Sequence, residues 1–268
     1  MLLEAKITIV IVAALIAAYT DFKKGYIYDW LNLPFIIVGA ILAIFSPNTL
    51  WAFVEAGLVF LIGYVFYRTG KIGGGDIKFF AGLALYFPFY KNTPFILVVL
   101  LLASLFAILF YGIYYLVLLL KKPTKEIIYS ILVSFFFAII ICILFLIFSL
   151  WYFALLICVF SFFAFTSLLL KDKIMQKFYR KSIPITKLLD DDLVDMNDLS
   201  LRYKKIKTIS TLEMYPLSDK TYKQLKQILP KTARIIVYRN LPVFGPFIAL
   251  GIIFGFVLLE FVNVWMLI

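Results

Sequence analysis

The chain has 268 residues, of which 64% are hydrophobic, and it carries a net charge of +11. A soluble domain does not need so much apolar sequence, so the composition indicates a polytopic membrane protein. Histidine is absent, which excludes histidine-ligated metal sites and Ser-His triads, and the separated cysteines Cys142 and Cys158 form no CxxC metal motif. Because basic residues collect in cytoplasmic loops, the charge requires no nucleic-acid partner. We expect no metal or cofactor.

Eight apolar segments approach the length of about 20 residues that a membrane-spanning helix needs. The first lacks the basic start and small-residue cleavage site of a signal peptide, so we expect it to be a retained span. Trp151 and Tyr152 suit an interfacial turn that divides the long run from 126 to 170 into two spans. The alternative is one bent helix there, with six or seven spans in all. The predicted spans lie at about 3–20, 31–46, 51–68, 76–90, 94–120, 127–148, 151–170 and 243–268.

Between residues 171 and 242 the composition shifts, because this segment holds 16 of the 26 Lys and Arg residues and 8 of the 15 acids. Alternating patterns at 201–209 and 233–239 predict strands, and the segment 219–229 predicts a short helix. The predicted fold class is therefore an all-α polytopic membrane protein of about eight transmembrane helices with a small α+β cytoplasmic domain. We expect a membrane domain at 1–170, a cytoplasmic domain at 171–242 and a last transmembrane helix at 243–268.

The distribution of basic residues between the loops predicts the orientation of the chain. Loops after the first, third and fifth spans carry eight Lys and Arg residues, whereas the opposite side carries only Lys6 and Lys91. Because positive loops stay in the cytoplasm, these loops and the segment 171–242 are predicted to be cytoplasmic, with both termini outside. The eight residues are Lys23, Lys24, Arg68, Lys71, Lys78, Lys121, Lys122 and Lys125.

Two acids have positions that suggest chemistry. Asp21 ends the first predicted span and Asp76 begins the fourth, so both are expected at the cytoplasmic membrane boundary. One ionised carboxylate could take a proton from water while a protonated partner donates to the leaving amine. Close approach would raise the pKa of one carboxyl group, so that the pair shares a proton. The alternative is that each is an ordinary helix-end acid.

The remaining acids near the spans have structural interpretations. Glu4 and Glu126 begin a span and complement its helix dipole, and Asp29 precedes a span as its cap or first-turn acid. Glu55 lies near enough to the outer face to reach water. Glu260, the acid in the last span, is a candidate for a buried pair or a functional role.

Three glycines, Gly73, Gly74 and Gly75, directly precede Asp76 in "KIGGGDIKFF" at 71–80. Each glycine costs about 1 kcal/mol in a helix interior relative to alanine, so the sequence predicts that no regular helix runs through 73–75. Backbone without β-carbons could unwind and let a peptide approach Asp76, which makes the three glycines candidate substrate-binding residues. A flexible loop after the third span is the alternative.

Two segments resemble the type IV prepilin peptidases, which are GxGD membrane aspartyl proteases. "GGGDIKFFAGLALYF" at 73–87 resembles the GxGD motif and its following helix, and "TDFKKGYIYDWLNLP" at 20–34 resembles the other catalytic segment. The resemblance implies that Asp21 and Asp76 are the catalytic pair, with Gly73 and Gly75 as the motif glycines and Gly74 in the variable place. Asp29, Asn32 and Lys78 occupy positions that resemble polar accessory sites of the family.

The chain departs from the bacterial members of that family. Tyr28 stands where their pattern has proline, and the cytoplasmic CxxC pairs and the large insertion between the first two spans are absent. The absence of the insertion argues against the associated N-methyltransferase activity. A soluble segment before the last span is more similar to the archaeal preflagellin and prepilin peptidases, although the eight predicted spans exceed the six expected of that group.

The resemblance implies a membrane aspartyl endopeptidase that removes the short basic class III signal peptide from archaeal preflagellins or type IV prepilin-like proteins. Its partners would be those substrates and membrane lipids, and the sequence leaves the oligomeric state open. The alternative is an ion-coupled membrane transporter with acidic relay residues, in which the glycines form a broken helix. A third hypothesis is a non-catalytic assembly platform that binds acidic partners or anionic lipid through 171–242.

Overall fold

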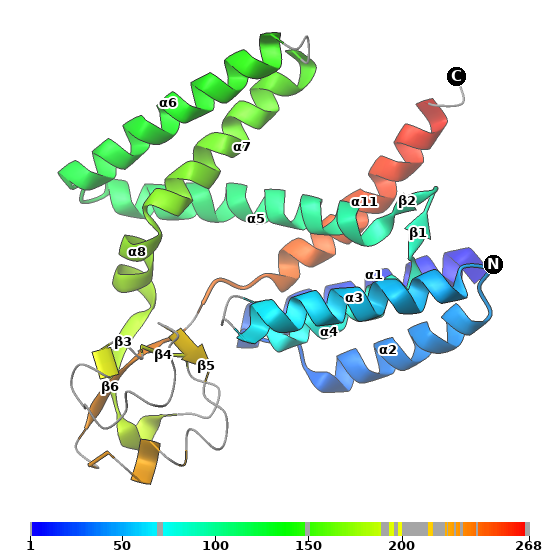
Figure 1. Ribbon diagram of the computed structural model, residues 1–268, viewed down its shortest axis with the longest axis horizontal. Coiled ribbons are helices and arrows are strands. Elements are labelled where there is room, and N and C mark those ends of the chain that lie inside the picture. The colour runs from blue at the N-terminus through cyan, green and yellow to red at the C-terminus, as the bar shows by residue number, and fades with distance from the viewer. Residues whose placement is uncertain are drawn as a thin grey trace. The chain divides into compact units, whose positions relative to one another are not determined.

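The long helices of the chain follow the predicted spans closely. A computed structural model describes residues 2–68, 72–147, 151–188, 193–195, 198–199, 214–216, 223, 225–227, 229–230, 233–239 and 241–265. Within these ranges the long helices are α1 (Leu2–Lys24), α2 (Asp29–Ile44), α3 (Thr49–Arg68), α4 (Gly74–Tyr86), α5 (Phe95–Leu120), α6 (Lys125–Ile147), α7 (Trp151–Leu169) and α11 (Gly245–Trp265) (Figure 1).

Five of these helices, α1, α3, α5, α6 and α11, are both long enough and apolar enough to cross a membrane. The helix α2 and the described apolar part of α7 are shorter. The helix α4 has 13 residues. At about 1.5 Å per residue it measures about 20 Å, less than the bilayer's hydrocarbon core of about 30 Å. The prediction of a polytopic helical membrane protein is confirmed.

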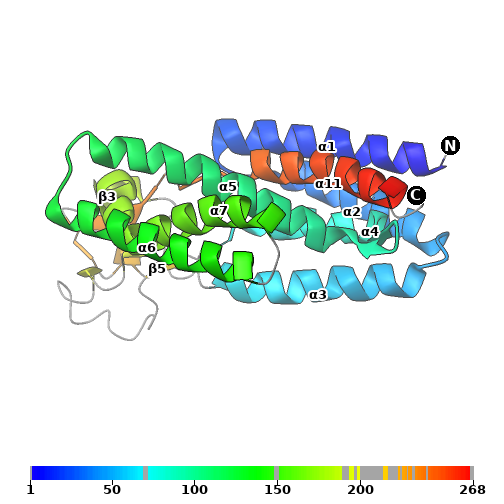
Figure 2. The same cartoon turned by 90° about the horizontal axis from the view of Figure 1, so that it is seen from above.

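The chain forms two compact units, one of Met1–Leu100 with Tyr179–Ile268 and the other of Leu101–Phe178. In the first unit, α4 packs against both α2 and α3, while α1 packs along α11 (Figures 1 and 2). Small residues on α1 contribute to the core that α1 shares with α11, and they let the two backbones approach closely. Those residues are Ala13, Ala14 and Ala17.

A short hairpin, β1 (Phe89–Tyr90) and β2 (Thr93–Pro94), connects α4 to α5. Its turn residues Lys91 and Asn92 both have positive φ, at 51° and 60°, as a two-residue type I′ turn requires. The ring of Tyr90 packs on Phe256 of α11 with 5.0 Å between centroids. The hairpin therefore fixes the C-terminal end of α4 to the middle of α11.

The segment between α7 and α11 contains a four-stranded antiparallel sheet in the order β3-β6-β4-β5. Its strands are β3 (Arg180–Pro184), β4 (Leu193–Asp195), β5 (Met214–Pro216) and β6 (Arg234–Tyr238). Buried Leu188, Val194, Leu225, Ile235 and Val237 belong to its separate apolar core. The sheet follows α8 (Lys171–Ile174) and a π-helix at Met175–Tyr179, and a 3₁₀ turn at Ile185–Lys187 comes after β3.

The predicted strand at 233–239 is confirmed by β6. The predicted helix at 219–229 is helical at the described positions 223 and 225–227. The predicted strand at 201–209 lies outside the described residues. The predicted boundaries of the cytoplasmic domain stay a prediction.

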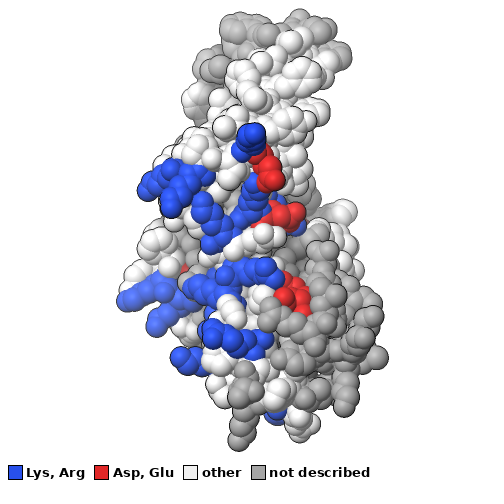
Figure 3. Space-filling view, turned by 90° about the vertical axis from the view of Figure 1, so that its left-hand side faces the viewer, with Lys and Arg blue, Asp and Glu red and all other residues white. Residues whose placement is uncertain are grey.

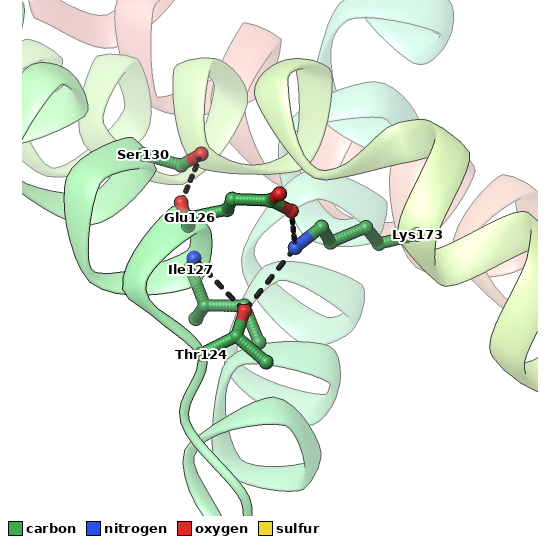
Figure 4. Close-up of polar contacts among 5 residues, drawn as sticks. All are labelled: Thr124, Glu126, Ile127, Ser130 and Lys173. Carbon is green, nitrogen blue, oxygen red and sulfur yellow. Dashed lines mark hydrogen bonds and ion pairs between the residues drawn. The ribbon is translucent and has the colours of Figure 1, made fainter.

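In the second unit, α6 and α7 lie against each other as a hairpin. One bent helix over this region, the alternative to the predicted turn, is therefore wrong. Thr124 caps α6, because its Oγ1 accepts a hydrogen bond of 3.4 Å from the Ile127 N–H, and Glu126 occupies the first turn (Figure 4). Lys173 forms an ion pair with Glu126 and a 3.2 Å hydrogen bond to Thr124. Glu126 is thus a helix-start acid, as predicted.

Candidate active site

Asp21 lies in the last turn of α1, where the helix is about to end. Gly25 terminates the helix with a φ of +82°, and its N–H donates to the Asp21 carbonyl oxygen over 2.7 Å. The Asp21 side chain is 5% exposed. Its Oδ2 accepts two hydrogen bonds from the start of α11, from the Phe244 N–H at 2.8 Å and the Gly245 N–H at 2.6 Å.

Asp76 lies in the first turn of α4. Gly73 is the N-cap residue, with extended backbone at φ −70° and ψ 142°, so Asp76 is the third residue of the helix. The Gly73 N–H donates back to the Asp76 carboxyl group, as the third residue of a capping box does. The other oxygen, Oδ1, is buried and has no hydrogen-bond partner in the part of the chain that the structure describes.

The two aspartates approach each other because two helix ends meet. The charge of Asp21 acts on Asp76, and the helices α1 and α4 that carry the two residues are in contact. No lysine or arginine forms an ion pair with either carboxyl group among the described residues. The arrangement therefore leaves two carboxyl groups that interact with each other and have no described cationic partner.

The prediction that no helix runs through 73–75 is wrong for two of the three glycines, because α4 begins at Gly74. The penalty for glycine applies to a helix interior, and these glycines lie in the first turn, where backbone N–H groups lack helical partners anyway. A β-carbon on Gly75 would lie 2.6 Å from the Ile27 carbonyl oxygen, and one on Gly73 would lie 2.8 Å from Asp76 Oδ2. The glycines therefore permit close packing.

The three residues at positions that resemble accessory sites of the family, Asp29, Asn32 and Lys78, take part in two contacts between α2 and α4 near Asp76. The fully buried Asn32 donates from Nδ2 to the Gly75 carbonyl oxygen over 3.0 Å. Lys78 forms an ion pair of 2.6 Å with Asp29 at the exposed edge. Asp29 is the first helical residue of α2, after the N-cap residue Tyr28, so it is a first-turn acid of that helix, as predicted. These contacts hold the start of α4 in place.

Sequence reasoning missed the contribution of α11 to this site. The signal that could have found it is the Gly245-Pro246 pair at the start of the last apolar segment, because proline favours the first turn of a helix. The pattern marks a helix start, but it does not say which side chain binds the free N–H groups there.

Glu260, the candidate for a buried pair or a functional role, lies far from the aspartates. It is 15 positions beyond Gly245 on α11, which is about 22 Å along the helix axis. Its carboxylate accepts a hydrogen bond from the Tyr90 hydroxyl and pairs with Lys91 at 3.3 Å. Burial raises the pKa of Tyr90 to about 12, with further contributions from Glu260, so Tyr90 remains a proton donor at neutral pH.

No group of three or more metal-ligating side chains occurs among the described residues. The candidate site therefore consists of the two carboxyl groups, the backbone N–H groups that bind them, and the buried amide of Asn32.

Comparisons with known proteins match the part of the chain that holds both aspartates. Residues 8–114 match the model of the type IV leader peptidase family. The chain is also 29% identical over 92 residues to the prepilin peptidase EppA of Methanothermobacter thermautotrophicus, in an alignment that covers 31% of this chain and 24% of that protein. The chain thus spans about a quarter of the length of this curated relative. No solved structure matches the chain.

The matched segment includes most of α1 and all of α2 to α4, and with them the helix ends that carry Asp21 and Asp76. Residues 8–114, which are less than half of the chain, are thus similar to the type IV leader peptidase family.

Proposed function

We propose that the protein is a membrane aspartyl endopeptidase that removes short basic leader peptides from prepilin-like or preflagellin-like proteins. The observation that carries this proposal is the meeting of Asp21 and Asp76 at two adjoining helix ends. The match of residues 8–114 to the type IV leader peptidase family and the similarity to a prepilin peptidase support the same reaction class.

The proposed mechanism divides acid and base between the two carboxyl groups. One ionised carboxylate takes a proton from water, and the resulting hydroxide attacks the scissile carbonyl carbon. The other, protonated carboxyl group donates a hydrogen bond to the carbonyl oxygen as its negative charge develops. Collapse of the tetrahedral intermediate breaks the C–N bond, and a carboxyl proton passes to the leaving amine. The two residues thus end the cycle with the number of protons they had at its start.

The substrate proposal follows from the location of the site at helix ends. We infer that this end of the first unit faces the cytoplasm, since the helix ends there carry Lys23, Lys24, Arg68 and Lys78. Among the charged side chains on the face in Figure 3, Lys and Arg predominate over Asp and Glu. A basic leader followed by an apolar helix would lie with its junction at this depth. Gly73 and its neighbours Gly74 and Gly75 remain the proposed backbone contacts, and 171–242 the proposed cytoplasmic domain.

Cleavage of a prepilin-like substrate in membranes tests the proposal. Asp21→Asn and Asp76→Asn should each lower kcat by about a thousandfold, because general acid–base catalysis contributes roughly 10²–10⁴. The matched control is Glu260→Gln, which removes an acid of the same unit that pairs far from the site. This control should retain cleavage.

The same three variants separate the peptidase from an ion-coupled transporter. A carrier with acidic relay residues would depend on Glu260 and would not process the substrate. Near-normal cleavage by Asp21→Asn or Asp76→Asn would exclude the two-aspartate mechanism. The partners of Glu260 at the end opposite the aspartates favour a structural role for that acid.

A further inference from the structure

The last helix contributes directly to the environment of Asp21, although it lies outside the segment that matches the family model. The N–H groups of Phe244 and Gly245 both donate hydrogen bonds to Oδ2 of Asp21, over 2.8 Å and 2.6 Å. These N–H groups lie at the start of a 21-residue helix, where backbone donors lack helical partners and favour a negative charge.

This contact requires a residue without a side chain at position 245. A β-carbon on Gly245 would lie 2.8 Å from the β-carbon of Asp21, 3.0 Å from its Oδ2 and 3.2 Å from the Ala17 carbonyl oxygen. The Ala17 carbonyl oxygen belongs to the backbone of α1, and the Asp21 β-carbon is bonded directly to that backbone. Neither atom can therefore rotate away. Any larger residue must push the start of α11 away from Asp21.

The residue before Gly245 connects the same helix start to the helix of the second aspartate. The ring of Phe244 contacts Phe80 of α4 with 6.4 Å between ring centroids, and Phe80 lies one turn beyond Asp76. Phe244 thus contacts α1 through its backbone and α4 through its side chain. The start of α11 is in position to set the separation of the two aspartates.

We propose that Gly245 is a positioning residue, and that the N–H groups at the start of α11 hold the Asp21 carboxylate in its reactive orientation toward Asp76. The inference rests on the proposed function, since it concerns the same reaction. Because both hydrogen bonds end on Oδ2, the orientation of Oδ1 is fixed as well. The described charged group that acts together with Asp21 is Asp76.

The test is Gly245→Ala, assayed for cleavage of a prepilin-like substrate by the full-length protein in membranes. We expect kcat to fall at least tenfold while KM changes less than twofold, because the substrate contacts are kept. Two glycine controls should stay within twofold of the parent. A β-carbon on Gly57 meets no atom within 4 Å, and one on Gly255 of the same helix approaches only Phe95 and Val99, at 3.3 Å and more.

A second measurement separates positioning from a loss of folded protein. The N–H donors of Phe244 and Gly245 bind the Asp21 carboxyl group directly, so a shift of the start of α11 in Gly245→Ala should displace the acidic limb of the kcat–pH profile. A smaller amount of folded enzyme lowers kcat at every pH and leaves the profile in place. Unchanged kcat, increased kcat, or a uniform loss without a pH displacement would each overturn the inference.

Failure of the inference and failure of the proposed function give different results. If the parent protein does not cleave, or if Asp21→Asn cleaves normally, the proposed function is wrong. If the parent cleaves, Asp21→Asn is inactive and Gly245→Ala behaves like Gly57→Ala, only the positioning role is wrong.

Discussion

At one end of the first compact unit, Asp21 and Asp76 are bound by backbone N–H groups, whereas toward the other end Glu260 is bound by Tyr90 and Lys91. Both arrangements bind carboxyl groups in a membrane protein, although Oδ1 of Asp76 keeps no partner among the described residues. They differ in charge, because Lys91 neutralises Glu260 while no described cation pairs with either aspartate.

The difference shows how an acid can be kept available for chemistry. A lysine partner neutralises the charge of a carboxylate. Backbone N–H groups fix the position of a carboxyl group and supply only partial charge. At the aspartate end, backbone contacts therefore fix carboxyl groups without a described cationic partner, whereas at the Glu260 end the carboxylate is paired with a lysine.

Substitution of Gly73, Gly74 or Gly75 by alanine should disturb the end of the first unit that holds the two aspartates. Gly75→Ala should have the largest effect. Its β-carbon would meet the Ile27 carbonyl oxygen at 2.6 Å, so the start of α4 must move and carry Asp76 with it. We expect cleavage to fall at least tenfold for Gly75→Ala, less for Gly73→Ala, and least for Gly74→Ala. Initial rates at equal amounts of folded protein measure this order.

Gly74→Ala is the informative member of that series. Its β-carbon would contact the Tyr67 ring at 3.5 Å, an ordinary van der Waals distance. If the glycines serve mainly to let a substrate approach, then Gly74→Ala should be as harmful as the other two. Equal losses at all three positions would contradict the packing explanation.

Asn32→Ala should weaken the same end by a smaller amount. It removes the hydrogen bond that this fully buried side chain donates to the carbonyl oxygen of Gly75 beside Asp76. Loss of a buried hydrogen bond costs about 1–3 kcal/mol, so the melting temperature in detergent should fall. The control Asn48→Ala changes an exposed asparagine and should melt like the parent. Equal melting of both variants would show that the Asn32 contact adds no stability.

Tyr90→Phe tests the other end and should have the smallest effect. It removes the hydroxyl that donates to Glu260 and keeps the ring that packs on Phe256. We expect a loss of about 1 kcal/mol in unfolding free energy and unchanged cleavage. A fall in kcat comparable to that of the aspartate variants would mean that the two ends do not differ in function.

Local patterns in the sequence predicted most of the helices and both aspartates. Each apolar run became a helix because a backbone in lipid must satisfy its hydrogen bonds internally. The strand β6 was predictable because its β-branched residues favour strands. The conformation of 73–75 was not, since the propensity of glycine gives way to tertiary packing at a helix start.

The sequence by itself determined the membrane class and the helix positions, because both depend on residues that are near one another in the chain. It also placed an aspartate at the end of α1 and another at the start of α4, and the resemblance of two segments to a known family predicted that these two act as a pair. Only the tertiary structure decided that Gly245, 224 positions away, donates to Asp21, that Gly75 packs on Ile27, and that Glu260 pairs with Tyr90. Such contacts depend on which helix faces pack together, and no local periodicity specifies that choice.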